Sequence, residues 1–132
     1  MQYVQNSAAR LLISVPKHHS ITPHLKNLNW LKIEYRVIFK IALLTYKILK
    51  FKTPAHLHEL LTPYEPTRML RSSSQKLLKE VKTKTKTIDC RAFSSAAPSI
   101  WNSLPLNIRD SISVNTFKKS LKTYLYKKCY CT

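Results

Sequence analysis

Glycine is absent from all 132 residues of the chain. The Walker A loop, the dinucleotide-binding fingerprint and the nucleophile elbow all need glycine, because only glycine gives the backbone geometry that these motifs use. The sequence contains none of them, and a nucleotide-dependent enzyme is therefore not expected. Helices and turns must also end without the residue that most easily adopts a left-handed backbone. We expect Asn, Ser and Pro at those positions instead.

Acidic residues are nearly as scarce. Six Asp and Glu stand against 23 Lys and Arg, and the formal net charge is +17. No two acids are close in sequence, so paired-carboxylate catalysis and carboxylate metal sites find no support. A charge this large opposes compaction unless an anionic partner offsets it. Nucleic acid is the first partner to expect, and an anionic membrane surface is the second.

Cysteine and histidine give little support to a metal site. Three cysteines are an odd number, and the start of the sequence lacks the apolar segment of a signal peptide, which predicts a reducing intracellular compartment rather than secretion. Cys129 and Cys131 have no later Cys or His to complete a zinc site by local spacing. The adjacent His18 and His19, and a second pair two residues apart, lack the i, i+4 spacing of ligands on one helix face. We expect no metal and no cofactor.

Long hydrophobic runs are also missing. The most apolar window, residues 37–49, is shorter than the roughly 20 residues that span a bilayer, and two lysines interrupt it, so no membrane span is predicted. On a helix, five bases around this window fall within about a quarter of the circumference, while apolar residues cover most of the rest. A solvated charged face and an anion-binding face are both open, and the lack of any acid among these bases favours anion binding more than usual. We call this set the basic stripe: Lys32, Arg36, Lys40, Lys47 and Lys50.

Two longer helices are predicted near the ends of the chain. The first covers residues 3–13, ends before Pro16, and has its apolar residues at core spacing. The last runs from a Ser113 N-cap to residue 128, with lysines outside its apolar stripe. Their predicted core residues are Val4, Ala8, Leu11 and Leu12 in the first, and Phe117, Leu121, Tyr124 and Leu125 in the last.

Two short helices are predicted where Thr precedes Pro, at Thr22–Pro23 and Thr53–Pro54. In each pair Thr is expected to be the N-cap and Pro the first helical residue.

The middle of the chain predicts a joint and an extended arm. Residues 62–68 carry two prolines within four residues and read as a loop. Residues 81–87, "VKTKTKT", alternate with period two, which is typical of a strand or an exposed arm. A solvated edge strand and a phosphate-tracking arm are both open, since lysine also blunts sheet edges. Its candidate nucleic-acid-binding bases are Arg68, Arg71, Lys82, Lys84 and Lys86.

The predicted fold is therefore mainly α, a small bundle of amphipathic helices with a short extended Lys/Thr arm. Its three parts are the helical residues 1–61, the loop and basic arm at 62–89, and the C-terminal helical residues 90–132.

Residues 90–110 form an unusually apolar segment for so basic a chain. We expect it to supply core, with Pro98 kinking or dividing it. Base stacking by Trp30 or Trp101 is the less favoured alternative, because each lies among apolar neighbours. The predicted core residues of the segment are Phe93, Ile100, Trp101 and Leu104.

Five short blocks, in a fixed order with short spacers, carry a family resemblance. The run Arg91–Pro105, "RAFSSAAPSIWNSLP", is the most specific of them, and the others are Val4–Leu12, Ile21–Leu49, Thr53–Ser73 and Thr116–Leu125. Together they resemble the region that follows the polymerase core in LINE-type, non-LTR retrotransposon reverse transcriptases. The resemblance covers nearly the whole chain.

The chain departs from this family at several points. Lys32 stands where the family usually has Pro, and Ile88, Asp89 and Cys90 stand where a Gly usually precedes the Arg-Ala-Phe, so the usual turn is not expected there. The Tyr-x-Asp-Asp turn that binds catalytic metals in these polymerases is missing, since no two aspartates are adjacent. The resemblance therefore implies a non-catalytic piece, with residues 1–61 corresponding to the end of the thumb.

In the parent enzymes this region is expected to hold the template and primer through their backbones, which gives affinity without sequence choice. The resemblance thus implies non-specific RNA or DNA binding by the basic stripe and the arm, inside the nucleus or cytoplasm. An intact retrotransposon polymerase is a possible further partner. The alternatives are a non-functional relic of a truncated element and a basic amphipathic protein bound to membrane surfaces. An independent enzyme is the least expected.

Overall fold

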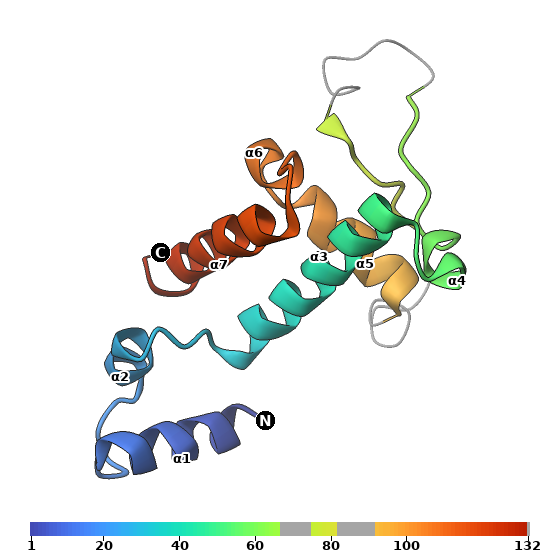
Figure 1. Cartoon of the computed structure of the whole chain (residues 1–132). Coiled ribbons are helices and arrows are strands. Elements are labelled where there is room, and N and C mark those ends of the chain that lie inside the picture. Colours follow the sequence, from blue (N-terminus) through green and yellow to red (C-terminus); the bar gives the residue numbers. More distant parts are fainter. Residues whose placement is uncertain (67–74, 82–91, 132) are drawn as a thin grey trace. The chain divides into compact units, whose positions relative to one another are not determined.

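A computed structural model describes residues 1–66, 75–81 and 92–131 (Figure 1). These residues form seven α-helices, and their single β-type pairing is an isolated antiparallel bridge between Pro63 and Leu78. The prediction of a mainly α fold is confirmed. The extended arm predicted around residues 82–86 lies outside the described residues.

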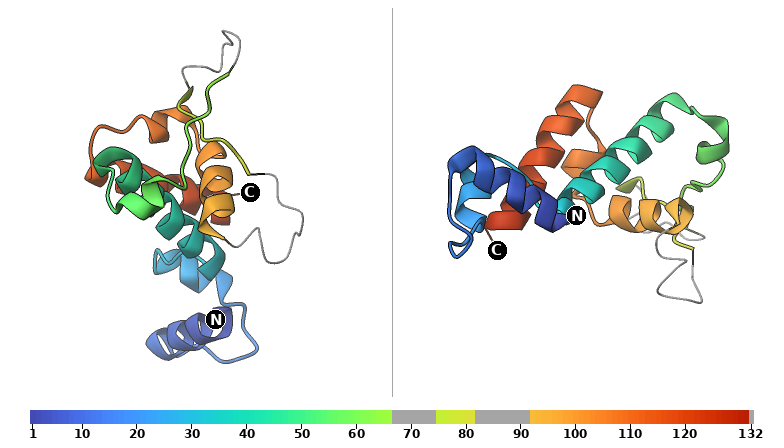
Figure 2. Two further views of the ribbon diagram at one scale, coloured as in Figure 1. Left: turned by 90° about the vertical axis from the view of Figure 1, so that its right-hand side faces the viewer. Right: turned by 90° about the horizontal axis from the view of Figure 1, so that it is seen from below.

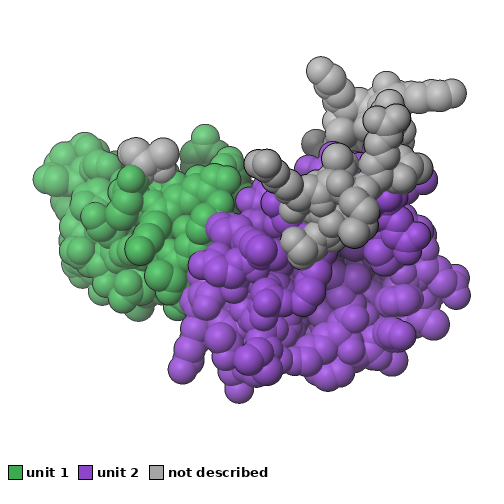
Figure 3. Space-filling model, turned by 90° about the horizontal axis from the view of Figure 1, so that it is seen from above, with its two compact units in different colours: residues 1–39, 121–132 green, residues 40–120 purple. Residues whose placement is uncertain are grey.

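Two compact units make up the chain. Unit 1 combines residues 1–39 with 121–132, and unit 2 comprises residues 40–120 (Figure 3). Two long helices, α3 (Ile33–Phe51) and α7 (Val114–Tyr130), each contribute residues to both units. The three-part division predicted from composition stays a prediction.

Unit 1 contains α1 (Gln2–Ile13) and α2 (Thr22–Asn27). Its small core consists of Ala9, Ile21 and Leu25, with Trp30 and Tyr130 among the half-buried residues packed against it. The phenol of Tyr130 donates to the carbonyl of Trp30, which ties the end of the chain to this core.

The predicted core face of α1 is wrong. Val4, Leu11 and Leu12 are exposed, and Gln5 and Ala9 are the buried residues of this helix. A methyl side chain at Ala9 fits the close packing there, and Gln5 Nε2 donates to the carbonyl of Leu31 at 2.8 Å. The side of α1 that carries Gln5 and Ala9 therefore packs against the protein, and the side that carries the larger apolar residues faces solvent.

The two Thr-Pro pairs do begin short helices, but the predicted caps are wrong. Thr22 is already the first residue of α2, after an Ile21 N-cap, and Pro54 is the N-cap of α4 (Ala55–His58). Neither helix has a side-chain hydrogen bond at its cap. In α2, Pro23 lies in the first turn and has no N–H, so one of the donors that a cap would satisfy is absent, and its fixed φ suits the start of a helix.

Three aromatic rings, one from each of three helices, pack together in unit 2; Figure 2 gives two further views of the ribbon. Phe117 of α7 stacks on Tyr46 of α3 with ring centroids 4.2 Å apart, and on Trp101 of α5 (Phe93–Asn102) at 6.1 Å. Of the four predicted core residues of this segment, Trp101 and Leu104 are buried, whereas Phe93 and Ile100 are only half-buried. Burial also rules out Trp101 as an open stacking platform for bases.

Pro98 does not divide its segment. It lies buried inside α5, which continues to Asn102. The break comes later, where Pro105 caps the short α6 (Leu106–Arg109). The "SLP" sequence therefore separates the two helices, and Pro98 serves as a buried surface of the first.

The predicted last helix is confirmed in detail. The backbone N–H of Thr116 donates to Ser113 Oγ at 3.1 Å, which makes Ser113 the N-cap of α7. Phe117, Leu121 and Leu125 are buried, and Tyr124 is half-buried.

Without glycine, four other residues adopt positive φ angles within the described part of the chain. Ser14 follows α1 at 55° and Lys52 follows α3 at 56°, while Asn29 and Lys76 lie in loops at 53° and 50°. The expectation of Ser and Asn at such positions is confirmed for two of them. The other two are Lys52 and Lys76, and a lysine is disfavoured there because its Cβ crowds a left-handed backbone.

Candidate nucleic-acid interface

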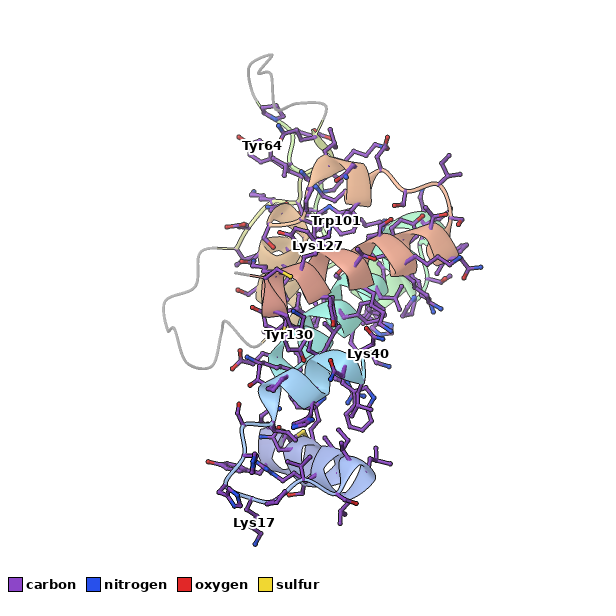
Figure 4. The ribbon with its side chains drawn as sticks, turned by 90° about the vertical axis from the view of Figure 1, so that its left-hand side faces the viewer. Lys17, Lys40, Tyr64, Trp101, Lys127 and Tyr130 are labelled. Atoms are coloured by element: carbon purple, nitrogen blue, oxygen red, sulfur yellow. The ribbon has the colours of Figure 1, made fainter. Side chains whose placement is uncertain are left out.

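The basic stripe lies along α3, with Lys32 just before its first residue. Arg36, Lys40 and Lys47 are exposed, and Lys40 is labelled in Figure 4. The one acid of this helix, Glu34, lies on the opposite side at about 100° per residue. Three cations thus line one side of a continuous helix and make no ion pair within the described residues.

The two ends of the stripe are held by the protein itself. Lys32 is half-buried, and its Nζ lies 6.0 Å from the ring centroid of Tyr130. Lys50 Nζ donates to the carbonyl of Ile112 and lies 5.7 Å from the ring centroid of Tyr46. These contacts leave Arg36, Lys40 and Lys47 as the members that project freely into solvent.

An exposed apolar line accompanies the three free cations. Val37, Leu44 and Phe51 follow one another at seven-residue spacing on α3 and are 50%, 39% and 55% exposed. A seven-residue repeat drifts by only about 20° on a helix, so the three side chains lie close to one line. This face of α3 therefore combines cations with uncovered apolar surface.

The second group of exposed lysines lies on α7. Lys118, Lys122 and Lys127 are exposed, on a helix whose buried side carries Phe117 and Leu121; Lys127 is labelled in Figure 4. This group matches the free cations of α3 in number and charge.

The predicted binding residues divide equally between the basic stripe and the arm. The arm residues Arg68, Arg71, Lys82, Lys84 and Lys86 lie outside the described residues. The structure does describe the segment 75–81 between them, and its attachment shows what the "WNSLP" run does.

Two side chains from that run and one from α6 hold the backbone of residues 75–78. Asn102 accepts a hydrogen bond from the N–H of Leu78 at 2.9 Å and donates to its carbonyl at 2.8 Å. Trp101 Nε1 donates to the carbonyl of Lys76 at 3.0 Å. Arg109 Nη1 donates to the carbonyl of Gln75 at 2.6 Å. Sequence reasoning identified the run as core but missed this anchoring, for which an Asn within an apolar run was the available signal.

The described part of the chain has no group of three or more His, Cys, Asp and Glu side chains that could hold a metal ion. Within it, no helix combines the length and apolar character needed to cross a bilayer.

Comparison with protein-family models found no match, and neither curated proteins nor solved structures gave a significant similarity. The resemblance to retrotransposon reverse transcriptases therefore stays a hypothesis based on the five sequence blocks.

Proposed function

We propose that this chain is a non-catalytic, helical segment of the retrotransposon reverse-transcriptase type that binds RNA or DNA non-specifically through the phosphate backbone. The observation that carries the proposal is the row of exposed cations Arg36, Lys40 and Lys47 on one side of α3, without an ion pair in the described residues. We place the protein in the nucleus or cytoplasm, where such partners occur. An intact polymerase of the same type would be a further partner.

The spacing of these cations suits a polyanion. At a rise of about 1.5 Å per residue, positions 36, 40 and 47 extend along about 16 Å of one helix. A cation that meets a phosphate releases condensed counterions, and this release makes binding strong at low salt without any reading of bases. Trp101 is buried, so recognition of bases by stacking on its ring has no support.

The test is binding of the full chain to a short RNA–DNA hybrid, followed by fluorescence anisotropy across a salt series. The first variant replaces Arg36, Lys40 and Lys47 by Gln. The second replaces Lys118, Lys122 and Lys127 by Gln, which removes the same charge from α7.

We expect the α3 variant to lose most of its affinity and its salt slope to fall by about one unit for each lost phosphate contact. The α7 variant should keep most of both. Equal losses in the two variants would show that only net charge matters, and the proposal of a positioned interface would be rejected. Thermal unfolding of each variant, read by circular dichroism, also tests the rival view of an unfolded relic, because a cooperative transition requires a packed core.

A second candidate function rests on Val37, Leu44 and Phe51. Exposed apolar side chains beside cations are the pattern of helices that lie on anionic membrane surfaces. Vesicles that contain anionic lipid should then bind the chain even with excess competitor RNA, and vesicles without anionic lipid should bind it much more weakly. If RNA displaces the chain from the vesicles completely, nucleic acid is the preferred partner of this face.

A further inference from the structure

Unit 2 contains a pocket whose lining includes none of the three exposed cations Arg36, Lys40 and Lys47. Its volume is about 390 Å³, which is within the usual range for small-molecule sites. Its lining is mainly apolar and includes two aromatic residues, Tyr46 and Trp101; Trp101 is labelled in Figure 4. The uncharged residues that matter below are Tyr46, Leu49, Pro63, Leu77, Leu78 and Trp101.

Three cations join this apolar wall, and they differ in how they are neutralised. Lys76 forms an ion pair with Asp110, and both side chains are well exposed. Lys50 donates to the carbonyl of Ile112. Arg109 is only 7% exposed and has no ion pair with any carboxylate of the described residues.

Arg109 is also incompletely hydrogen-bonded. Its Nη1 donates to the carbonyl of Gln75, but its buried Nε has no hydrogen-bond partner within the described residues. Burial without a counter-charge lowers the pKa of Arg109. A buried cation costs several kcal/mol unless an anion and full hydrogen bonding compensate it, and such groups are normally paired. The pocket therefore has an apolar wall and a buried cation that lacks an anion.

We propose that this pocket binds a small organic acid, whose carboxylate pairs with Arg109 and whose apolar body lies against Leu49, Leu77 and Leu78. A carboxylate suits the planar guanidinium because the two can share parallel N–H···O bonds. The apolar wall supplies affinity for a hydrocarbon body by removing it from water. The pocket shares Lys50 with the basic stripe, but its lining includes none of Arg36, Lys40 and Lys47, the cations that carry the proposed nucleic-acid interface.

The probe is octanoate, compared with octanol, which has the same apolar body without the charge, and with acetate, which has the charge without the body. Binding to the full chain is followed by NMR at the indole N–H of Trp101, which donates to the carbonyl of Lys76 at the pocket. A Trp30→Phe variant assigns this signal, because the chain has two tryptophans. We expect saturable shifts with octanoate, at least about tenfold weaker binding of octanol, and none with acetate at the same concentrations.

Four variants separate the parts of the proposal. Arg109→Met removes the cation at similar volume and should abolish the preference for octanoate over octanol. Arg109→Lys keeps the charge but loses the planar guanidinium, and should weaken the binding of octanoate by about tenfold. Leu77→Trp keeps Arg109 but fills the pocket, and should block both ligands. Lys122→Gln removes a charge outside the pocket and should bind octanoate like the parent chain.

Each contrary result would overturn the proposal. It fails if octanol binds as well as octanoate, if Leu77→Trp still binds, or if Lys122→Gln loses as much affinity as Arg109→Lys. Asp89, the one acid outside the described residues, is tested by Asp89→Asn. If only this variant distinguishes octanoate from octanol, the anion that Arg109 lacks belongs to the chain itself and no ligand is needed.

Discussion

The carboxamide of Asn102 pairs with both backbone groups of Leu78, accepting from its N–H at 2.9 Å and donating to its carbonyl at 2.8 Å. One side chain thus does what a neighbouring strand would do for that residue. Leu78 is buried, and its N–H and carbonyl have few other ways to be satisfied there. The bridge between Leu78 and Pro63 lies on the same segment. Asn102 therefore anchors the segment 75–81 to α5 at Leu78.

Replacing Asn102 by Ala should cost about 1–3 kcal/mol of unfolding free energy, because two buried backbone groups lose their partner. Asn102→Asp should cost more, since a carboxylate cannot donate to the Leu78 carbonyl and would face Glu80, whose carboxylate lies 3.2 Å from Asn102 Nδ2. Urea unfolding measures both. Asn107→Ala, at an exposed position of α6, is the control and should change stability by less than about 0.5 kcal/mol. Equal effects at the two positions would show that Asn102 is not an anchor.

Lys52→Gly should stabilise the chain by about 0.5–1 kcal/mol. Lys52 has φ of 56° directly after α3, where its Cβ is strained and glycine is the usual residue. The same substitution at Lys47, inside the helix, should instead destabilise by about 1 kcal/mol. Thermal unfolding of the two variants is the measurement, and their stabilities should change in opposite directions. A loss of stability in both would mean that Lys52 does not adopt the left-handed conformation in solution.

Phe117→Ala should destabilise unit 2 by about 3–5 kcal/mol. The ring is fully buried, stacks on Tyr46 at 4.2 Å, and leaves a cavity between three helices when removed. The total free energy of unfolding of a small domain is only about 5–15 kcal/mol, so this variant should unfold at a much lower urea concentration. Ile112→Ala is the control because Ile112 is 89% exposed, and its effect should stay within about 0.5 kcal/mol.

A raised pKa at Tyr130 predicts a loss of stability in alkaline solution. Burial is the main cause, with Cys129 and Tyr126 adding to it, and together they raise the pKa of this phenol to about 12. An unfolded tyrosine loses its proton near pH 10, so between about pH 10 and 12 only the unfolded chain is deprotonated at this site. The contribution of Tyr130 to the free energy of unfolding is therefore complete below pH 10 and is lost as the pH rises through that window.

The measurement is urea unfolding at several pH values from 8 to above 11. Tyr130→Phe should start less stable, because it loses the hydrogen bond to the Trp30 carbonyl, but should decline less steeply across the alkaline window. Tyr3→Phe changes a residue that is 86% exposed and should decline like the parent chain. Parallel curves for all three proteins would contradict the assignment to Tyr130.

The predictable parts of the fold are those in which local pattern and packing agree. Phe117, Leu121 and Leu125 form an apolar stripe at helical spacing behind a Ser113 cap, and α7 has that form. The cations of α3 could be placed on one side for the same reason. Lys32 and Lys50 could not be distinguished from the others, because their contacts with Tyr130 and Ile112 join residues far apart in sequence.

The pocket and the orientation of α1 could not be predicted. Arg109 reads as one more surface base in a chain with +17 net charge, and only the packing of α6 buries it. In α1 the hydrophobic pattern and the buried side disagree, since Gln5 and Ala9 are buried while Leu11 and Leu12 are exposed. A periodic pattern shows which residues share a face, but a competing side with small and hydrogen-bonding residues can pack instead.

The orientation of α1 leads to a final prediction. Leu11 and Leu12 are 82% and 67% exposed, so replacing both by Gln should change the unfolding free energy by less than about 1 kcal/mol. Ala9→Leu, on the buried side, should cost about 1–3 kcal/mol because Ala9 is fully buried and has no room for a larger side chain. If the double Gln variant costs several kcal/mol and Ala9→Leu costs nothing, α1 packs through its leucines as the periodicity alone suggests. The two variants therefore decide between the sequence pattern and the structure at this helix.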